Sequence, residues 1–274
     1  MSIETQIDKN GIATITMNNA KKHNAFDEVI ILQLTEAFKN MNDDASVRLI
    51  CLRAKGKSFS AGADLNWMKK MAAYSWEENY QDSLALASLM STIANSDKPT
   101  LAIVQGAAYG GGVGLVACCD FAFASDAANF CLSEVKLGLI PAVISPYVVN
   151  AIGARESTRY FISAESFNAT TATKIGLVSE VVKAKDLDNY VDTYLEKVSL
   201  NAPIAIKEAK KLVKYVADGP ITEEMIRETA SKISDRRASL EGIEGTTAFL
   251  EKRDPIWPIE TTNVKDLADG DGDV

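Results

Sequence analysis

The chain has 274 residues, of which 47% are hydrophobic and 24% charged, an ordinary composition for a globular protein. Its net charge of -8 disfavours nucleic acid or an anionic membrane surface as the main partner. No apolar run reaches the roughly 20 residues that span a bilayer, and residues 1–10 lack the basic and apolar regions of a secretion signal. A cytoplasmic protein is therefore expected.

Strands and helices alternate through the first two thirds of the chain. Residues 3–8 and 12–18 flank Asn10-Gly11 and predict a hairpin. Further strands are predicted at residues 48–53, 100–104, 121–124, 130–132 and 177–182. Helices are predicted at residues 24–42, 67–71, 77–94, 113–119, 142–152 and 169–174, the fourth of them apolar nearly all round and therefore buried. These elements predict an α/β core over residues 1–198.

Strand signals become rare after about Leu187. Helices are predicted at residues 188–200, 203–217, 222–239 and 241–251. The first of them completes the core, and residues 199–258 are predicted to form a C-terminal helical segment. Residues 259–274 form an acidic tail that is expected to be disordered. The run from Asp269 to Asp273 resembles the start of a calcium loop, but the chain ends before the later ligands of such a loop.

Several other chemical motifs are incomplete. The four cysteines, Cys51, Cys118, Cys119 and Cys131, lack the spacing of a zinc site or a disulfide framework, so buried reduced thiols are expected. Gly56-Lys57-Ser58 lacks the first glycine of a P-loop. The single histidine, His23, excludes a histidine-rich metal site, and its polar turn favours a solvated loop residue.

Two glycine-bearing loops carry the strongest functional signal. Ser60-Ala61-Gly62-Ala63-Asp64 and Gly110-Gly111-Gly112 each stand between a predicted strand and a predicted helix. Such a position leaves backbone N–H groups free at the positive end of a helix, and two converging donors form an oxyanion hole. The alternative is that the glycines serve only tight turns and close helix packing.

Glu134 is the candidate general base. It stands in the apolar stretch Phe130-Cys131-Leu132-Ser133-Glu134-Val135, where partial desolvation would raise the pKa of its carboxyl group. The alternative is a carboxylate at the end of a strand that pairs with Lys136 or Arg155.

Together these segments resemble the crotonase (enoyl-CoA hydratase/isomerase) superfamily. The resemblance rests on Phe59 to Leu65, Gln105 to Gly112, Cys119-Asp120, Phe130 to Leu139 and Ala248 to Arg253, and it covers nearly the whole chain. Residues 131–149 look most like the bacterial methylglutaconyl-CoA hydratases of leucine breakdown. Hydratases of branched terpenoid glutaconyl-CoA esters look similar as well.

The resemblance implies a spiral of ββα repeats whose C-terminal helices drive formation of trimers, which usually pair into hexamers. It implies a coenzyme A thioester as substrate, with no redox or metal cofactor. Ala63 and Gly111 match the two donors of the oxyanion hole. The positions matched to the coenzyme A path are Lys22, Ala25, Ala61 and Gly62, together with Phe249 and Lys252 near the C-terminal end.

One position departs from the familiar hydratases, which carry two catalytic glutamates. This chain has Gly114 at the first position, so Glu134 stands alone. Relatives that dehalogenate aromatic thioesters or close a ring also carry glycine there, but they rely on an aspartate where this chain has Ala142, Val143 and Ile144. Some hydratases of the superfamily use one glutamate, and hydration of a branched 2-enoyl-CoA, most of all 3-methylglutaconyl-CoA, is therefore predicted.

Two alternatives stay open. One is a double-bond isomerase that uses a single glutamate, and the other is an acyl-CoA-binding protein without catalytic activity. A glutaconyl substrate would call for a cation near the acyl pocket. Lys69, Lys70 and Arg155 are candidates for it, although each is more simply a solvated helix charge.

Overall fold

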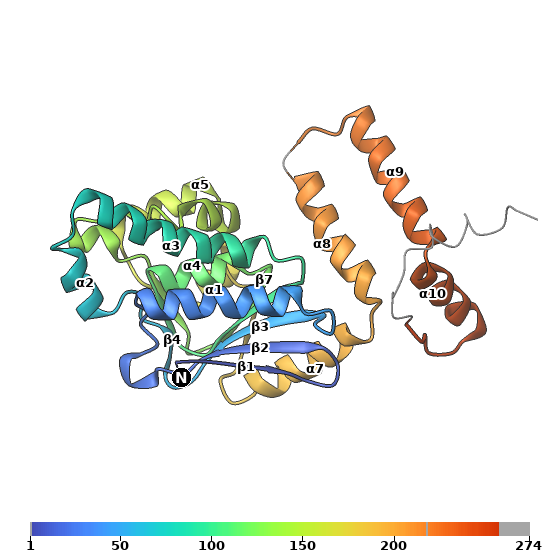
Figure 1. The fold of residues 1–274 in the computed structure, drawn as a ribbon, viewed down its shortest axis with the longest axis horizontal. Coiled ribbons are helices and arrows are strands. Elements are labelled where there is room, and N and C mark those ends of the chain that lie inside the picture. The colour runs from blue at the N-terminus through green and yellow to red at the C-terminus, as the bar shows by residue number, and fades with distance from the viewer. Residues whose placement is uncertain (1, 218, 258–274) are drawn as a thin grey trace, which may run out of the picture. The chain divides into compact units, whose positions relative to one another are not determined.

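The computed structural model describes residues 2–217 and 219–257 (Figure 1). The chain forms two compact units, one ending at Leu200 and one beginning at Asn201, and each is described by itself. The acidic tail predicted at residues 259–274 lies outside the described residues. No helix in the described ranges combines the length and apolar character that crossing a membrane requires.

The first unit contains a six-stranded sheet with the strand order β1-β2-β3-β5-β7-β10. Its strands are β1 (Ile3–Ile7), β2 (Ile12–Met17), β3 (Leu49–Ala54), β5 (Thr100–Val104), β7 (Phe121–Ser125) and β10 (Glu180–Val182). The predicted hairpin is confirmed, because β1 pairs antiparallel with β2 and Ile3 faces Met17. The other neighbours in the sheet pair in parallel.

A second, smaller sheet consists of four strands in the order β4-β6-β8-β9. They are β4 (Ser58–Ser60), β6 (Ala107–Tyr109), β8 (Asn129–Cys131) and β9 (Phe167–Asn168). The chain therefore repeats one pattern, in which a long strand of the first sheet leads to a short strand of the second and then to a helix. This pattern confirms the α/β class and the repeating ββα units.

Helices cover both faces of the large sheet. They are α1 (Glu28–Asp43), α2 (Leu65–Met71), α3 (Trp76–Ala94), α4 (Gly111–Cys118), α5 (Ser145–Ser163), α6 (Ala169–Lys174) and α7 (Leu187–Ser199). Successive side chains of β3 point to opposite faces of the sheet, which explains why helices cover both faces. Ile50 and Leu52 belong to the main core with α1, whereas Leu49 and Cys51 pack into a smaller core with α7. Figure 1 shows α7 on the opposite side of the strands from α1.

Two predicted helices have different bounds in the structure. The helix predicted at residues 24–42 begins at Glu28, because His23 and Asn24 adopt a left-handed backbone with φ of 52° each. Asp27 then caps α1 by accepting a hydrogen bond from Ile30 N at 3.0 Å. The helix predicted at residues 142–152 runs as α5 from Ser145 to Ser163, with a non-helical residue at Gly153.

The four cysteines are buried and unpaired by disulfides, as predicted. Burial raises the pKa of the Cys51 thiol to about 12 and raises that of Cys118 as well. Thiolate chemistry is therefore suppressed at both positions.

The second unit contains α8 (Pro203–Ala217), α9 (Glu223–Ala238) and α10 (Leu240–Glu251), close to the predicted bounds. The buried carboxylate of Glu241, on α10, connects the three helices through hydrogen bonds. It accepts hydrogen bonds from Ile204 N and Ala205 N at the start of α8 and from Arg236 Nη2 at the end of α9. A carboxylate is favoured at this place because the first N–H groups of a helix have no partner within the helix.

Candidate active site

The first glycine-bearing loop connects β4 to α2. Asp64 caps α2 by accepting hydrogen bonds from Asn66 N at 2.8 Å and Trp67 N at 3.3 Å, and it pairs with Lys22 Nζ at 2.8 Å. The ion pair and these N–H groups lower the pKa of Asp64, so the capping carboxylate stays charged. The cap fixes the backbone of the neighbouring residue, Ala63.

A short bridge orients the N–H of Ala63. Phe26 N donates to Gly62 O at 2.9 Å, and Asp64 N donates to Phe26 O at 3.0 Å. Successive peptide groups of an extended chain point in opposite directions, so the N–H of Ala63, which lies between these two bonds, points away from Phe26. It is therefore available to a ligand.

The second loop lies against the first. A Cβ on Gly62, whose φ is +82°, would lie 2.8 Å from Tyr109 O and 3.8 Å from Gly111 N, so side chains larger than glycine are excluded. Gly110 caps α4, and its own N–H donates to Cys131 O at 2.8 Å. As the first residue of α4, Gly111 has an N–H with no acceptor inside the helix.

Both loops open into one cavity of about 1010 Å³. Ala63, Gly111 and Glu134 all line it, so the structure brings together the three residues that the sequence selected for chemistry. The remaining lining residues are Phe26, Trp67, Met68, Met71, Ala72, Asn79, Asp82, Ser83, Leu86, and the stretch from Leu137 to Ile144. Apolar side chains dominate this list, as is usual for a site that holds a small organic molecule.

Glu134 begins a short helical turn, η2 (Glu134–Leu137), beside Gly110. A Cβ on Gly110 would lie 3.1 Å from Glu134 Oε1. Burial raises the pKa of the Glu134 carboxyl group, and its Oε2 has no hydrogen-bond partner among the described residues. No ion pair to Lys136 or Arg155 is present in that part of the chain, so the alternative of a paired strand-end carboxylate is wrong.

Gly114 occupies the position that the resemblance matches to the other glutamate of familiar hydratases. A Cβ on Gly114 would overlap Ile144 Cγ2 and would lie 3.3 Å from Met90 Cε. Ile144 therefore fills the space that a longer side chain at position 114 would need. With Ala142 and Val143 it forms an apolar wall of the cavity.

The residues matched to the coenzyme A path fall into two groups. Ala61 and Gly62 belong to the first loop, and Lys22 and Ala25 precede α1; the cavity lining includes none of these four residues. Phe249 lies on α10 with 81% of its surface exposed, and Lys252 ends that helix in a left-handed conformation. His23 is an exposed loop residue, as predicted, with its Nδ1 3.1 Å from Ser58 Oγ.

Sequence reasoning missed Phe26, Trp67 and the residues of α3 that line the cavity. One signal was present: Asn79, Asp82, Ser83 and Leu86 stand at positions i, i+3, i+4 and i+7 and so share one helix face. That spacing alone does not reveal what the face contacts.

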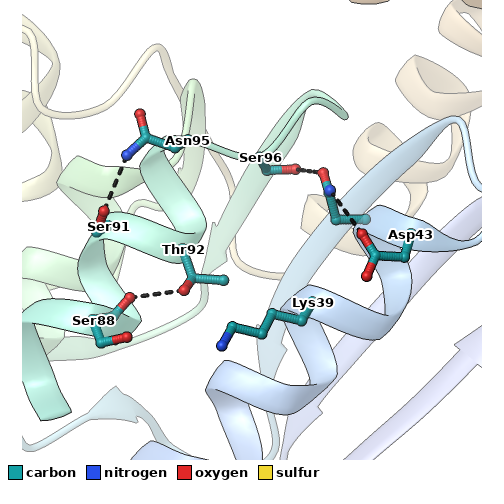
Figure 2. A pocket seen from close by; sticks show the side chains of 8 residues that line it. Lys39, Asp43, Ser88, Ser91, Thr92, Asn95 and Ser96 are labelled. Atoms are coloured by element: carbon teal, nitrogen blue, oxygen red, sulfur yellow. Dashed lines mark hydrogen bonds between the residues drawn. The ribbon is translucent and has the colours of Figure 1, made fainter.

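A second hollow lies between α1 and α3 (Figure 2), with a volume of about 320 Å³. Its polar groups bind one another. Asn95 Nδ2 donates to Ser91 Oγ at 3.0 Å, and Ser96 Oγ donates to Asn42 Oδ1 at 3.0 Å. Asp43, the carboxylate in its lining, accepts a hydrogen bond from Asn42 Nδ2 at 3.3 Å, whereas Glu134 Oε2 in the larger cavity has no partner among the described residues.

Free N–H donors in two loops, with a carboxylate in the same apolar cavity, are the groups that stabilisation of an oxyanion and transfer of a proton require. The family model for enoyl-CoA hydratase/isomerase matches residues 8–259, and the chain belongs to this family.

Individual relatives agree with this assignment. The chain is 31% identical over 272 residues to the carnitinyl-CoA dehydratase of Escherichia coli K12, covering 94% of this chain and 99% of that one. The structure resembles an enoyl-CoA hydratase from Shewanella pealeana, with 41% identity, a TM-score of 0.89, and coverage of 94% and 96%. It also resembles a Legionella pneumophila chain of the enoyl-CoA hydratase/isomerase (crotonase) group, with 50% identity, a TM-score of 0.91, and coverage of 94% and 99%.

Proposed function

We propose that this protein adds water across the 2,3 double bond of a branched 2-enoyl-CoA. The observation that carries the proposal is the unpaired Glu134 carboxylate, with its pKa raised by burial, in the same cavity as the N–H groups of Ala63 and Gly111. A base with a raised pKa works closer to neutral pH, where proton transfer is most effective.

In the proposed reaction the thioester oxygen accepts hydrogen bonds from Ala63 N and Gly111 N. Glu134 takes a proton from a water molecule whose oxygen bonds to C3, and the negative charge moves to the thioester oxygen as an enolate. Glu134 then returns the proton to C2, so the product gains one water in total. Each donor of such a hole typically lowers the barrier by about 3 kcal/mol. Acid–base groups and N–H donors suffice for this sequence, so we expect no redox or metal cofactor.

Glu134→Gln tests the proposal on crotonyl-CoA. The amide cannot accept the proton from water, so kcat is expected to fall by about 10² to 10⁴-fold while coenzyme A ester binding persists. Glu77→Gln, the same change at an exposed residue of α3, is the matched control. Near-normal hydration by Glu134→Gln would refute the mechanism.

The acyl group that we propose is 3-methylglutaconyl, which would place the enzyme in leucine breakdown in the cytoplasm. A related terpenoid glutaconyl ester is the neighbouring choice. Support comes from the resemblance of residues 131–149, which supply Leu137 to Ile144 of the cavity wall. The ratio of kcat/KM for 3-methylglutaconyl-CoA to that for crotonyl-CoA measures this preference.

For the rest of the thioester we propose that Lys22, Ala25, Ala61 and Gly62 line the coenzyme A path, with Phe249 and Lys252 approaching from the C-terminal helices. Lys22 is half exposed and bound to Asp64, so its ammonium group can also face solvent-borne phosphate. Charge reversal at Lys22 should raise KM for every acyl group tested, whereas a purely structural Lys22 would change stability alone.

Double-bond isomerisation is the second candidate. One carboxylate can shuttle a proton between C2 and C4, and Ile144 occupies the space that a second acid at position 114 would take. Assays with a 3-enoyl-CoA separate the two reactions, because hydration leaves that substrate unchanged. An acyl-CoA-binding protein without activity would alter neither substrate.

A further inference from the structure

The cavity has one polar corner, formed by α3. Asn79, Asp82 and Ser83 line it on the helix face that also carries Leu86. Facing residues of α2, among them Met68 and Met71, are apolar. Removing a carboxylate from water is costly unless hydrogen bonds, a paired charge or a bound proton compensate for it.

A buried indole holds Asp82 in place. Trp67 is 4% exposed, and its Nε1 donates to Asp82 Oδ1 at 3.0 Å. No donor from the described residues reaches Asp82 Oδ2. One oxygen is thus used for positioning, and the other remains available to a ligand in the cavity.

The charges around Asp82 favour its neutral form. Burial is the largest cause that raises the pKa of Asp82; the Trp67 N–H lowers it, and Glu28 on α1 raises it. Lys70 on α2 is already paired with Glu28 at 2.7 Å. Glu134 is the other acid in the cavity lining, and neither lysine nor arginine occurs among the described lining residues. A second carboxylate that enters this corner therefore meets no cation, and two adjacent carboxyl groups tend to share one proton.

A series of contacts connects this corner with the second glycine-bearing loop. A Cβ on Gly111 would overlap the Phe26 ring, the Phe26 and Trp67 ring centres are 6.3 Å apart, and Trp67 Nε1 binds Asp82 Oδ1 at 3.0 Å.

We infer that Asp82 determines specificity for the far end of the acyl chain, where it holds a distal carboxylate through one shared proton. This inference rests on the proposed function. The proton is taken up from solvent when the ester binds. The resulting O–H donates to the distal carboxylate, while Trp67 keeps its bond to the other oxygen of Asp82.

The test compares 3-methylglutaconyl-CoA with crotonyl-CoA, which lacks the distal carboxylate, from pH 6 to 8. The ratio of their kcat/KM values cancels the titration of Glu134, because both reactions share it. For the wild type this ratio is expected to fall as pH rises, by up to about tenfold per pH unit. Asp82→Asn carries a permanent amide donor and an acceptor for Trp67, so its ratio is expected to be flat. Glu77→Gln should retain the wild-type slope.

Three results would overturn the inference while hydration itself stands. They are a flat wild-type ratio, an unchanged slope in Asp82→Asn, and turnover of crotonyl-CoA without any turnover of 3-methylglutaconyl-CoA. A preference for a 4-trimethylammonio-crotonyl thioester that Asp82→Asn abolishes would also overturn it, since Asp82 would then act as an anion. Failure to hydrate either ester refutes the proposed function instead. In that case calorimetric binding of the glutaconyl ester, with proton uptake measured in two buffers, still decides the role of Asp82.

Discussion

At the scale of single residues, the site depends on which groups lack partners. Glu134 Oε2 is buried without a hydrogen bond from the described residues, and Ala63 and Gly111 carry N–H groups that their own elements do not use. The sequence selected these three residues from local context and from the family resemblance. It could not select Phe26, Trp67 or Asp82, because helical spacing defines a face but not the cavity that the face will meet.

The raised pKa of Glu134 predicts the pH dependence of the reaction. Glu134 must be deprotonated in the free enzyme, and its pKa lies above the ordinary value of 4.5. The kcat/KM for crotonyl-CoA is therefore expected to be full at high pH and to fall by about tenfold per unit below that pKa. Initial rates in a constant-ionic-strength buffer series measure it. An acid limb that survives in the residual activity of Glu134→Gln would assign the titration to another group.

Gly114 and Ile144 form the second residue-scale prediction. Alanine at position 114 gains up to about 1 kcal/mol of helix propensity, but its Cβ overlaps Ile144, and overpacking of this kind costs about 1 to 3 kcal/mol. Gly114→Ala should therefore destabilise the protein in urea unfolding. In the double variant, Ile144→Ala removes the overlap with Cγ2 and leaves a contact of 2.8 Å with Cβ, so the loss should be smaller than the sum of the two single losses. Strict additivity would contradict the proposed contact.

At the scale of elements, length decided what the sequence could predict. Long periodic helices such as α3 and α8 were predicted within a residue or so of their observed bounds. The strands β4, β6 and β9 were missed because two or three residues are too few to show alternation. The start of α1 was misplaced because Asn24 has a tertiary role. Its side-chain Nδ2 donates to Lys55 O and Ser58 O at 2.8 Å, which holds it outside the helix.

Asp64, the N-cap of α2, should affect both the stability of that helix and the proposed catalysis. Asp64→Ala removes the bonds to Asn66 N and Trp67 N, which should cost about 1 kcal/mol of stability. Because Ala63 adjoins the cap, a displaced N–H should also lower kcat, by up to about 10²-fold. Thr222→Ala is the matched control, since Thr222 caps α9 through Met225 N at 3.1 Å in the second unit. If Asp64→Ala and Thr222→Ala lost the same stability and kept the same kcat, Asp64 would serve stability alone.

At the scale of the whole molecule, the second unit exposes several large apolar side chains. Ile226 and Ile233 of α9 are 57% and 49% exposed, and Leu250 of α10 is 73% exposed. Ile226 and Ile233 stand seven residues apart and so share one face of α9, and exposed apolar faces of this kind often bind other proteins. We propose that it joins copies of this chain into a trimer or a hexamer.

Light scattering coupled to size exclusion tests this assembly. The wild type is expected to elute at three or six times the 29.6 kDa of one chain, and Ile226→Asp with Ile233→Asp should elute as smaller species. Glu223→Gln, a change at an exposed residue of the same helix, should leave the assembly intact. A monomeric wild type at micromolar concentration would contradict the proposal.

The bridge between Phe26 and Ala63 is one of several links that join distant parts of the chain at the site. Successive ββα repeats of the first unit supply the cavity residues Phe26, Ala63, Gly111, Glu134 and Ile144. No single repeat therefore contains the whole cavity. Parallel strand pairing of this kind requires loops to close over long sequence separations, which slows folding. During synthesis the cavity is complete only after the segment through Ile144 has emerged and docked. Recovery of activity on refolding should therefore lag behind the return of helical circular dichroism.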